Sequence, residues 1–225
     1  MKIIVINLER AEERKERMLL QFQKLGISDY IFYPAIDGKD ITNKNFFGNI
    51  APGHFGHPRK FQKGEIGCII SHIGAITFAK LNNWDYFLLL EDDVILCDDF
   101  NDRLNLLFKL LPSSWDLVYL SGHTYYTPAP FILPSLLPVN FKVSGAYSCI
   151  IKNIAYDKII KKFSSFETTT DDLYEEMILR EKSLKSFIFF PFFCYPIVED
   201  SYIWETSGNK IPHASVRYFK NKLNE

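Results

Sequence analysis

"KIIVIN", residues 2–7, opens the chain as a short apolar run rich in β-branched side chains, a pattern typical of a strand buried on both faces. From residue 10 to residue 25 the apolar spacing becomes helical, and residues 30–36 form a second strand-like run. The turn signal Asp37-Gly38 closes that run. A strand, a helix and a strand in this order predict a parallel pair joined by a right-handed crossover, and therefore an α/β fold.

The rest of the chain continues this alternation of helices and strands. Residues 39–63 and the proline-rich residues 127–140 follow neither period, so we expect a functional or mobile loop at the first and a loop or lid at the second. The tail from Pro191 is expected to be irregular. No repeat or linker divides the chain, which predicts a single domain. The expected helices cover residues 64–83, 100–111, 153–163 and 171–182, and the expected strands cover residues 84–90, 115–120, 141–152 and 186–190.

Composition narrows the classes of function. The chain has 225 residues, of which 47% are hydrophobic and 24% charged, as in an ordinary globular domain. Its net charge of −1 gives no basic excess, so no nucleic-acid partner is expected. The four cysteines are far apart and form no C-x-x-C pair, which fits a reducing cytoplasm. No signal peptide and no membrane span are expected, because the apolar runs are short and the longest is broken by prolines.

Three consecutive carboxylates follow the apolar run in "LLLEDDVIL", residues 88–96. Ligands of open α/β sheets bind beyond the carboxyl ends of the parallel strands, where Glu91, Asp92 and Asp93 would lie. Clustered carboxylates repel one another unless a positive group lies among them. The oxygens would suit Mg²⁺ or Mn²⁺, which can in turn hold a diphosphate. The alternative is that the triplet is solvated in a turn or caps the next helix, and these residues alone leave both interpretations open.

The segments around the triplet distinguish the two interpretations. "VINLERAEERKERM", "GEIGCIISH", "LLLEDDVIL", "SGAYSCIIK" and "VEDS" occur in this order along the chain. In this combination the sequence resembles glycosyltransferase family 25, which contains bacterial lipooligosaccharide galactosyltransferases and collagen galactosyltransferases. The resemblance covers nearly the whole chain and is looser over residues 121–140 and near the C-terminus.

That resemblance implies a GT-A fold, a UDP-sugar donor, usually UDP-galactose, and inversion at the anomeric carbon. It implies one GT-A-like domain over residues 1–225, with a nucleotide-sugar-binding half in residues 1–120 and an acceptor-side half in residues 121–225. The acidic triplet is similar to the DxD-type motif of that fold. On that pattern Asp93 is the ligand of a Mn²⁺ or Mg²⁺ ion, and Asp92 contacts the donor. The acceptor would be the oligosaccharide of a lipooligosaccharide or lipopolysaccharide.

Inverting transfer needs a carboxylate that deprotonates the acceptor hydroxyl. Asp171 and Asp172, in "TTTDDLYEEM", begin an expected helix, where the helix dipole favours an ionised carboxylate. Either residue could instead serve only as a helix cap. The resemblance favours Asp171 as the base, while Glu199 and Asp200 are rival candidates for the base or for supporting contacts to the donor.

Other polar residues are candidates for binding the donor. Asn7 and Arg10 follow the first strand and could meet the uridine or its phosphates, although Arg10 could also lie on a solvated helix face. Ser71 and His72 are expected to support the donor pocket, because a Cys-x-x-x-His pair alone lacks the ligands of a structural zinc. Glu91 is a further candidate for the donor pocket. His213 could supply a second metal ligand, or could be an ordinary surface histidine.

Two functions of different classes fit these residues. One is the transferase, and the other is an inactive nucleotide-sugar-binding or scaffold protein of the same fold, since a fold does not fix an activity. We expect a cytoplasmic protein. Weak peripheral contact with the inner membrane would come through the apolar residues 128–137 and the basic, aromatic residues 217–222.

Overall fold

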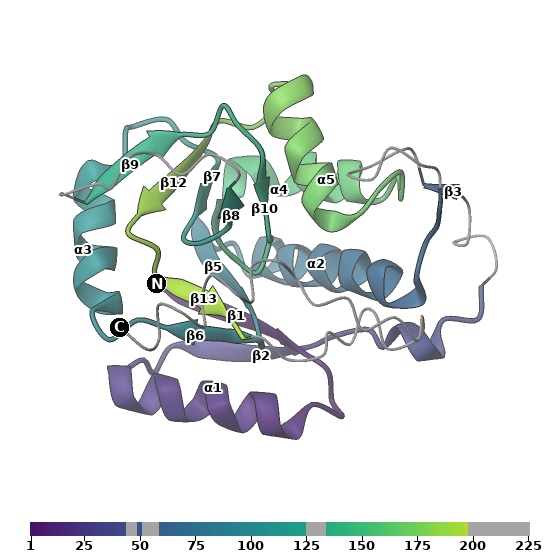
Figure 1. Ribbon diagram of the computed structural model, residues 1–225, viewed down its shortest axis with the longest axis horizontal. Helices are drawn as coiled ribbons and strands as arrows, with labels where there is room; N and C mark the ends of the chain where they lie inside the picture. Colours follow the sequence, from purple (N-terminus) through teal and green to yellow (C-terminus); the bar gives the residue numbers. More distant parts are fainter. Residues whose placement is uncertain (44–48, 51–58, 125–133, 198–225) are drawn as a thin grey trace.

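The computed structural model describes residues 1–43, 49–50, 59–124 and 134–197. A seven-stranded sheet forms its centre, with the strand order β2-β1-β5-β11-β7-β12-β9 (Figure 1). In chain order its strands are β1 (Lys2–Asn7), β2 (Tyr30–Pro34), β5 (Tyr86–Glu91), β7 (Leu117–Tyr119), β9 (Ser135–Pro138), β11 (Ser148–Lys152) and β12 (Ser186–Phe190).

Most strands of this sheet run in one direction. β1 is parallel to both β2 and β5, and β12 is parallel to β7. β11 is antiparallel to β5 on one side and to β7 on the other, so β7 has the same direction as β5. Only β11 and the edge strand β9 point the other way among the seven. The parallel opening and the predicted α/β class with a mostly parallel sheet are therefore confirmed.

Five helices cover the two faces of the sheet (Figure 1). Because side chains alternate along a strand, Ile4 and Ile6 of β1 pack in one core while Ile3 and Val5 pack in the other. The first core includes residues of α2 (Lys63–Leu81), α4 (Asn153–Phe163) and α5 (Thr170–Glu175). The second includes residues of α1 (Glu12–Leu25) and α3 (Phe100–Leu110). Apolar residues on both faces of β1 and β5 thus pack in cores that contain helix residues, which explains why these strands read as continuous apolar runs.

Smaller elements extend the ends of the sheet. A π-helical turn, η3 (Glu176–Arg180), continues α5, and a 3₁₀ turn, η1 (Gly38–Asp40), follows β2. The two-stranded pairs are β3 (Asn49–Ile50) with β4 (Arg59–Lys60), β6 (Val94–Leu96) with β13 (Cys194–Pro196), and β8 (His123–Thr124) with β10 (Val143–Ser144).

Three sequence expectations differ from the structure. Residues 135–138 form β9 rather than a loop or lid; β9 pairs only with β12, and an edge position tolerates proline because one side of the strand needs no donor. The single strand expected over residues 141–152 is divided into β10 and β11 at Gly145, whose φ of +96° interrupts extended backbone. The tail after Pro191 is not wholly irregular, since β13 pairs with β6.

Strands from both predicted halves of the chain enter the central sheet, while the assignment of a donor side and an acceptor side to these halves stays a prediction. Within the described residues, α2 is the one helix whose length and apolar composition would be enough to cross a bilayer. Half of its most apolar window is buried inside the protein, as in a core helix.

Candidate active site

The parallel pairing of β1 and β5 brings their carboxyl ends together. Ile6 lies opposite Glu91 in the register, so the residues that follow, Asn7 and Asp92, become neighbours. The Asn7 Nδ2 atom donates to Asp92 Oδ2 at 2.6 Å and to the carbonyl oxygen of Ala11 at 3.2 Å. Asn7 and Asp92 are each only 6% exposed. Asn7 therefore anchors the acidic turn to the start of α1; its contact with a donor stays a prediction.

Arg14, from the first turns of α1, is the basic group among these carboxylates. Its Nη1 atom lies 3.1 Å from Asp92 Oδ1 and 3.7 Å from Asp93 Oδ2, and its side chain is 9% exposed. Burial raises the pKa of Asp92, and the hydrogen bond from Asn7 and the charge of Arg14 offset part of that rise. Sequence reasoning missed this role of Arg14. The available signal was its position one helical turn after Arg10.

Asp93 differs from Asp92 in that one of its carboxylate oxygens accepts no hydrogen bond from the described residues. Its Oδ1 atom is buried and has no hydrogen-bond partner within the part of the chain that the structure describes. Burial and, next, the charge of Glu91 raise the pKa of Asp93 to about 7, while Arg14 acts in the opposite direction. One guanidinium thus faces Asp92 and Asp93, with Glu91 beside them. This partly compensated negative charge and the orphaned oxygen suit a divalent cation with oxygen ligands.

The first half of α2 closes another side of the site. Ser71 Oγ donates to the carbonyl oxygen of Gly67 at 2.6 Å and accepts from the Ile36 N–H at 2.8 Å, which ties α2 to the loop after β2. A Cβ atom on Gly67 would lie 2.5 Å from the carbonyl oxygen of Ile36, so the close approach requires glycine in "GEIGC". Ser71 therefore shapes the wall of the site.

His72, Cys68 and Glu91 meet at the base of this wall. His72 is fully buried, and its Nε2 atom lies 3.1 Å from Glu91 Oε1. Cys68 Sγ lies 4.0 Å from the same oxygen and 3.3 Å from the hydroxyl of Thr170 at the start of α5. Burial and the neighbouring Glu91 raise the pKa of the Cys68 thiol well above its usual value. His72 is thus buried against Glu91, and Thr170 is a neighbour of Cys68 that the sequence did not indicate.

Asp171 begins the same short helix and binds a turn of the backbone. Its Oδ2 and Oδ1 atoms accept from the N–H groups of Gly145 and Ala146, both at 2.8 Å. Burial raises the pKa of Asp171, and these two hydrogen bonds lower it in part. The charge of Glu91 contributes to the rise, which couples Asp171 to the acidic triplet electrostatically. Asp171 thus has a fixed orientation beside the site.

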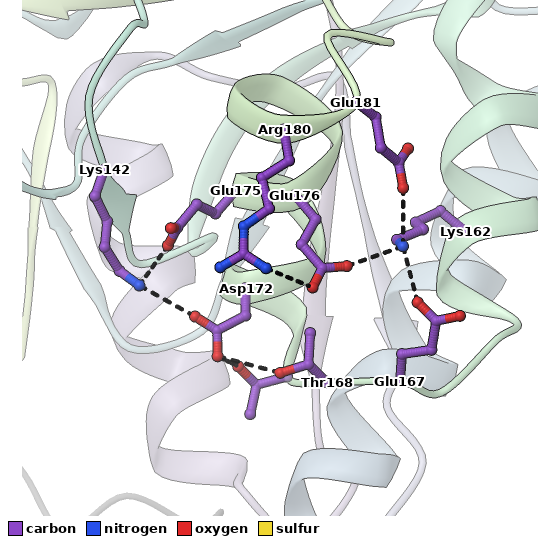
Figure 2. Close-up of polar contacts among 10 residues, drawn as sticks. Lys142, Lys162, Glu167, Thr168, Asp172, Glu175, Glu176, Arg180 and Glu181 are labelled. Atoms are coloured by element: carbon purple, nitrogen blue, oxygen red, sulfur yellow. Dashed lines mark hydrogen bonds and ion pairs between the residues drawn. The ribbon is translucent and has the colours of Figure 1, made fainter. Parts of the chain in front are cut away.

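Asp172 has a different environment from its neighbour. Lys142 Nζ lies 3.3 Å from Asp172 Oδ1 and also pairs with Glu175, while the hydroxyls of Thr168 and Thr169 donate to Asp172 Oδ2 (Figure 2). Since basic and hydroxyl groups engage both of its oxygens, Asp172 holds the start of α5 against Lys142. The geometry separates the two adjacent candidates, although neither assignment as a base is tested by it.

A cleft opens between α1, the loop after β2, α2 and the end of β5. Arg10, predicted to contact the donor, lines it and pairs with Asp37 across the opening. Cys68, Ser71, His72 and all three carboxylates of the triplet line it as well. The structure therefore brings most of the predicted donor-binding residues to one cleft.

Some predicted residues lie outside the described part of the chain. These are the rival base candidates Glu199 and Asp200 and the second metal ligand His213. Residues 217–222 and most of residues 128–137, the predicted membrane contacts, also lie outside it. Their roles stay predictions.

Comparison with known proteins identifies the family of the chain. A family model described as glycosyltransferase family 25 (LPS biosynthesis protein) matches residues 1–170. A protein of Anopheles gambiae named glycosyltransferase 25 family member is 36% identical over an alignment of 127 residues. The alignment covers 52% of this chain and 21% of the relative. A mouse protein named inactive glycosyltransferase 25 family member 3 is 31% identical over 147 residues, 61% of this chain and 24% of its own length. The chain thus spans about a quarter or less of these two relatives.

One solved structure shows a more distant likeness. A glycosyltransferase involved in the glycosylation of the major capsid of PBCV-1 aligns with 83% of this chain and 80% of its own, at 10% identity and a TM-score of 0.48. Because that score is below 0.5, the fold class rests on the strands and helices described above.

Proposed function

Since the chain belongs to glycosyltransferase family 25, we propose that it is a metal-dependent, inverting glycosyltransferase. In this proposal galactose passes from UDP-galactose to a sugar hydroxyl of a lipooligosaccharide or lipopolysaccharide acceptor. The mostly parallel sheet flanked by helices is the arrangement expected of the GT-A fold.

Asp93 is the observation that carries the proposal. Its buried Oδ1 atom has no hydrogen-bond partner in the described residues, and it lies in a cleft at the carboxyl end of a parallel strand. An unsatisfied buried carboxylate oxygen is costly unless a ligand completes it. A Mn²⁺ or Mg²⁺ ion bound there would stabilise, as a Lewis acid, the charge that develops on the leaving diphosphate. The oxygen-rich donor set of Asp93 fits such a cation.

The other residues of the cleft position the substrate groups. Asn7 and Arg14 hold the acidic turn, so that Asp93 keeps one orientation and does not have to reorganise during the reaction. Arg10, 34% exposed in its side chain and paired with Asp37, is available at the rim for the phosphates of the donor. The turn after β5 and the turn before α1 therefore present the groups that would recognise the diphosphate.

Asp171 is the carboxylate that we assign as the base. The oxygen of the acceptor hydroxyl attacks the anomeric carbon, the bond from that carbon to the diphosphate oxygen breaks, and the hydroxyl proton passes to Asp171. Burial raises the pKa of Asp171, which makes it a better proton acceptor, and the Gly145 and Ala146 N–H groups orient it. The lone pairs that these two donors leave open are the ones that would take the proton.

A second candidate is a protein that binds a nucleotide sugar without turnover. The matched mouse relative carries the word inactive in its name, so membership of the family does not by itself establish catalysis. Donor binding with no transfer to any acceptor would identify this function.

A thermal-shift panel tests the proposal. UDP-galactose, UDP-glucose, UDP-N-acetylglucosamine and GDP-mannose would each be added with Mn²⁺ or with EDTA. A ligand at one hundred times its dissociation constant stabilises the fold by about 2.7 kcal/mol, enough for a shift of several degrees. We expect a Mn²⁺-dependent shift with UDP-galactose in the wild type and its loss in Asp93→Asn. A shift with no sugar nucleotide would count against the proposal, and a shift with a different one would reassign the donor.

A further inference from the structure

We propose that Cys68, His72 and Glu91 form a binding site for one thiophilic divalent cation, Zn²⁺. This site is distinct from the contact of Asp93 with the cation that accompanies the donor diphosphate. It does not depend on the proposed transferase activity, because an inactive protein of the same fold would hold it equally well.

The three side chains are already gathered at ligand spacing. Cys68 Sγ, His72 Nε2 and Glu91 Oε1 all lie within 4.8 Å of one another. The Glu91 oxygen is 3.1 Å from the nitrogen and 4.0 Å from the sulfur. Tetrahedral zinc with its usual bond lengths separates a nitrogen and an oxygen ligand by about 3.3 Å, and a sulfur and an oxygen ligand by about 3.6 Å. Small side-chain rotations would therefore bring these atoms to a common ion.

Regular secondary structure places the ligands, so the site is not built on a loop. Cys68 and His72 are four residues apart on α2 and thus share one helix face. Glu91 is the last residue of β5, on which α2 packs. The imidazole is fully buried, and Nε2 is its ring nitrogen that faces Glu91, at 3.1 Å. A helix face held against a strand end is a rigid support for an ion.

A hydroxyl beside the sulfur can stabilise a metal-bound thiolate. Cation binding releases the thiol proton of Cys68 to the solvent, and the Thr170 hydroxyl, 3.3 Å away, then donates to the thiolate. Such a hydrogen bond in the outer shell orients a ligand and supports metal affinity. The thiolate and the Glu91 carboxylate together balance the two charges of the ion. Arg14, which neutralises Asp92 and Asp93, does not have to be displaced.

The donor set selects the class of ion. Thiolate and imidazole ligands favour Zn²⁺, whereas Mg²⁺ and Mn²⁺ favour carboxylate, carbonyl and water oxygens. Cys68, His72 and Glu91 all line the cleft, so a fourth coordination position would open towards it. Three protein ligands with one open position are the pattern of zinc sites that bind water or a substrate oxygen. An acceptor hydroxyl is the group of the proposed reaction that could occupy that position.

Cobalt titration of the chelator-treated protein tests the site directly, without an activity assay. Co²⁺ replaces Zn²⁺ in such sites, and a thiolate ligand gives a near-ultraviolet charge-transfer band that other ligands do not. We expect the band to saturate at one equivalent of Co²⁺ in the wild type and to disappear on addition of Zn²⁺. Cys68→Ser should lack the band and should bind Co²⁺ at least about 10–100-fold more weakly. Cys97→Ser, which alters another partly exposed free cysteine, is the matched control and should keep the band.

Two further measurements distinguish this site from the contact at Asp93. Asp93→Asn should retain the cobalt band, even if it abolishes the effect of Mn²⁺ on donor binding. In the wild type, Zn²⁺ should protect Cys68 from alkylation, mapped by mass spectrometry, while Cys97 in the same sample stays reactive. This second readout needs no variant, so it holds even if Cys68→Ser fails to fold. If the wild type shows no band and Zn²⁺ does not protect Cys68, then Glu91 and His72 form only a hydrogen bond and the proposal is wrong.

Discussion

The carboxylates at the end of β5 and those around Lys162 on α4 both gather at a basic side chain, but two of the three carboxylates around Lys162 are much more exposed to solvent. At β5, Asp92 and Asp93 share the guanidinium of Arg14, whose side chain is only 9% exposed. Burial raises the pKa of both carboxyls, that of Asp93 to about 7. The charge of Arg14 does not fully stabilise the ionised carboxylates, because the free-energy cost of desolvating them exceeds the stabilisation that one guanidinium provides.

Around Lys162, solvation of the carboxylates outweighs the cost of burial (Figure 2). The ammonium lies 2.9 Å from each of three carboxylates, and two of these, on Glu167 and Glu181, are 56% and 43% exposed. The hydrogen bonds that Lys162 donates to the three glutamates raise the pKa of its ammonium group. Water solvates the excess negative charge, so this cluster can persist without any further ligand.

The two clusters therefore differ in whether water can solvate their excess negative charge, and a bound cation would compensate it only at β5. Both clusters combine carboxylates with a basic side chain, and each has more carboxylates than basic side chains. Only the cluster at β5 has a buried carboxylate oxygen, Asp93 Oδ1, that nothing in the described residues satisfies as a hydrogen-bond partner. The predictions below test this difference by changing each cluster in turn.

The largest effect is expected from Asp93→Asn. The change removes the charge that would hold the donor cation, at a cost of several kcal/mol of transition-state stabilisation. We expect kcat/KM to fall roughly a thousandfold, about 4 kcal/mol, with the fold retained. Steady-state kinetics with UDP-galactose and circular dichroism measure the two quantities. Full activity in the folded variant would show that Asp93 is not the metal ligand.

Asp171→Asn is expected to lower kcat by roughly a hundredfold or more, because a general base typically contributes about 10²–10⁴-fold. Asp172→Asn is the matched control, since the adjacent carboxylate binds Lys142 and two threonine hydroxyls rather than the Gly145-Ala146 backbone. Its kcat should change much less. Equal losses of kcat in the two variants would indicate a general disturbance of α5, and melting temperatures would reveal it.

Arg14→Met removes the guanidinium that lies beside Asp92 and Asp93. Breaking a buried pair leaves an uncompensated carboxylate, so the free energy of unfolding should fall by about 3 kcal/mol. Urea denaturation measures this loss. Lys24→Met, which breaks a pair with Asp98 in which both side chains are exposed, provides a comparison and should cost less than about 1 kcal/mol.

The ionisation of Asp93 predicts a pH dependence of stability. Its pKa is raised from 3.8 to about 7 in the folded protein, so between these values the folded carboxyl is protonated while the unfolded one is ionised. Stability should therefore fall as pH rises through this window. The side chain is 27% exposed, which limits the effect to the order of 1 kcal/mol, or about 2–4 °C. The melting temperature of Asp93→Asn, measured relative to that of the wild type, should therefore rise with pH through this window. A difference that does not change with pH would contradict this prediction.

The smallest effect is expected from Lys162→Met in the solvated cluster. The variant leaves three glutamates without their shared partner, but water screens them, so the loss of stability should be below about 1 kcal/mol and should shrink in high salt. Thermal denaturation at low and high salt measures both. A loss as large as that of Arg14→Met would show that solvent exposure does not separate the two clusters.

Local sequence patterns predicted the regular elements well where the apolar period was clear. The bounds of β1, α4 and β12 agree with the expected strand, helix and strand, because each reads as one uninterrupted period. The sequence did not predict β9, because the prolines around it are typical of loops and because its partner strand β12 is remote in the sequence. Cap signals likewise did not reveal that Asp171 binds the backbone of Gly145 and Ala146, about two dozen residues earlier.

Local periodicity and the order of motifs were enough to predict the α/β class, the family, and the position of Glu91, Asp92 and Asp93 at the end of a parallel strand. They did not show which carboxylate is anchored by neighbouring side chains and which has a buried oxygen without a partner in the described residues. Arg14 lies 78 residues from Asp92 in the chain, and Cys68 lies 102 residues from Thr170. Burial and pairing arise from contacts between such distant residues, and no local pattern encodes them.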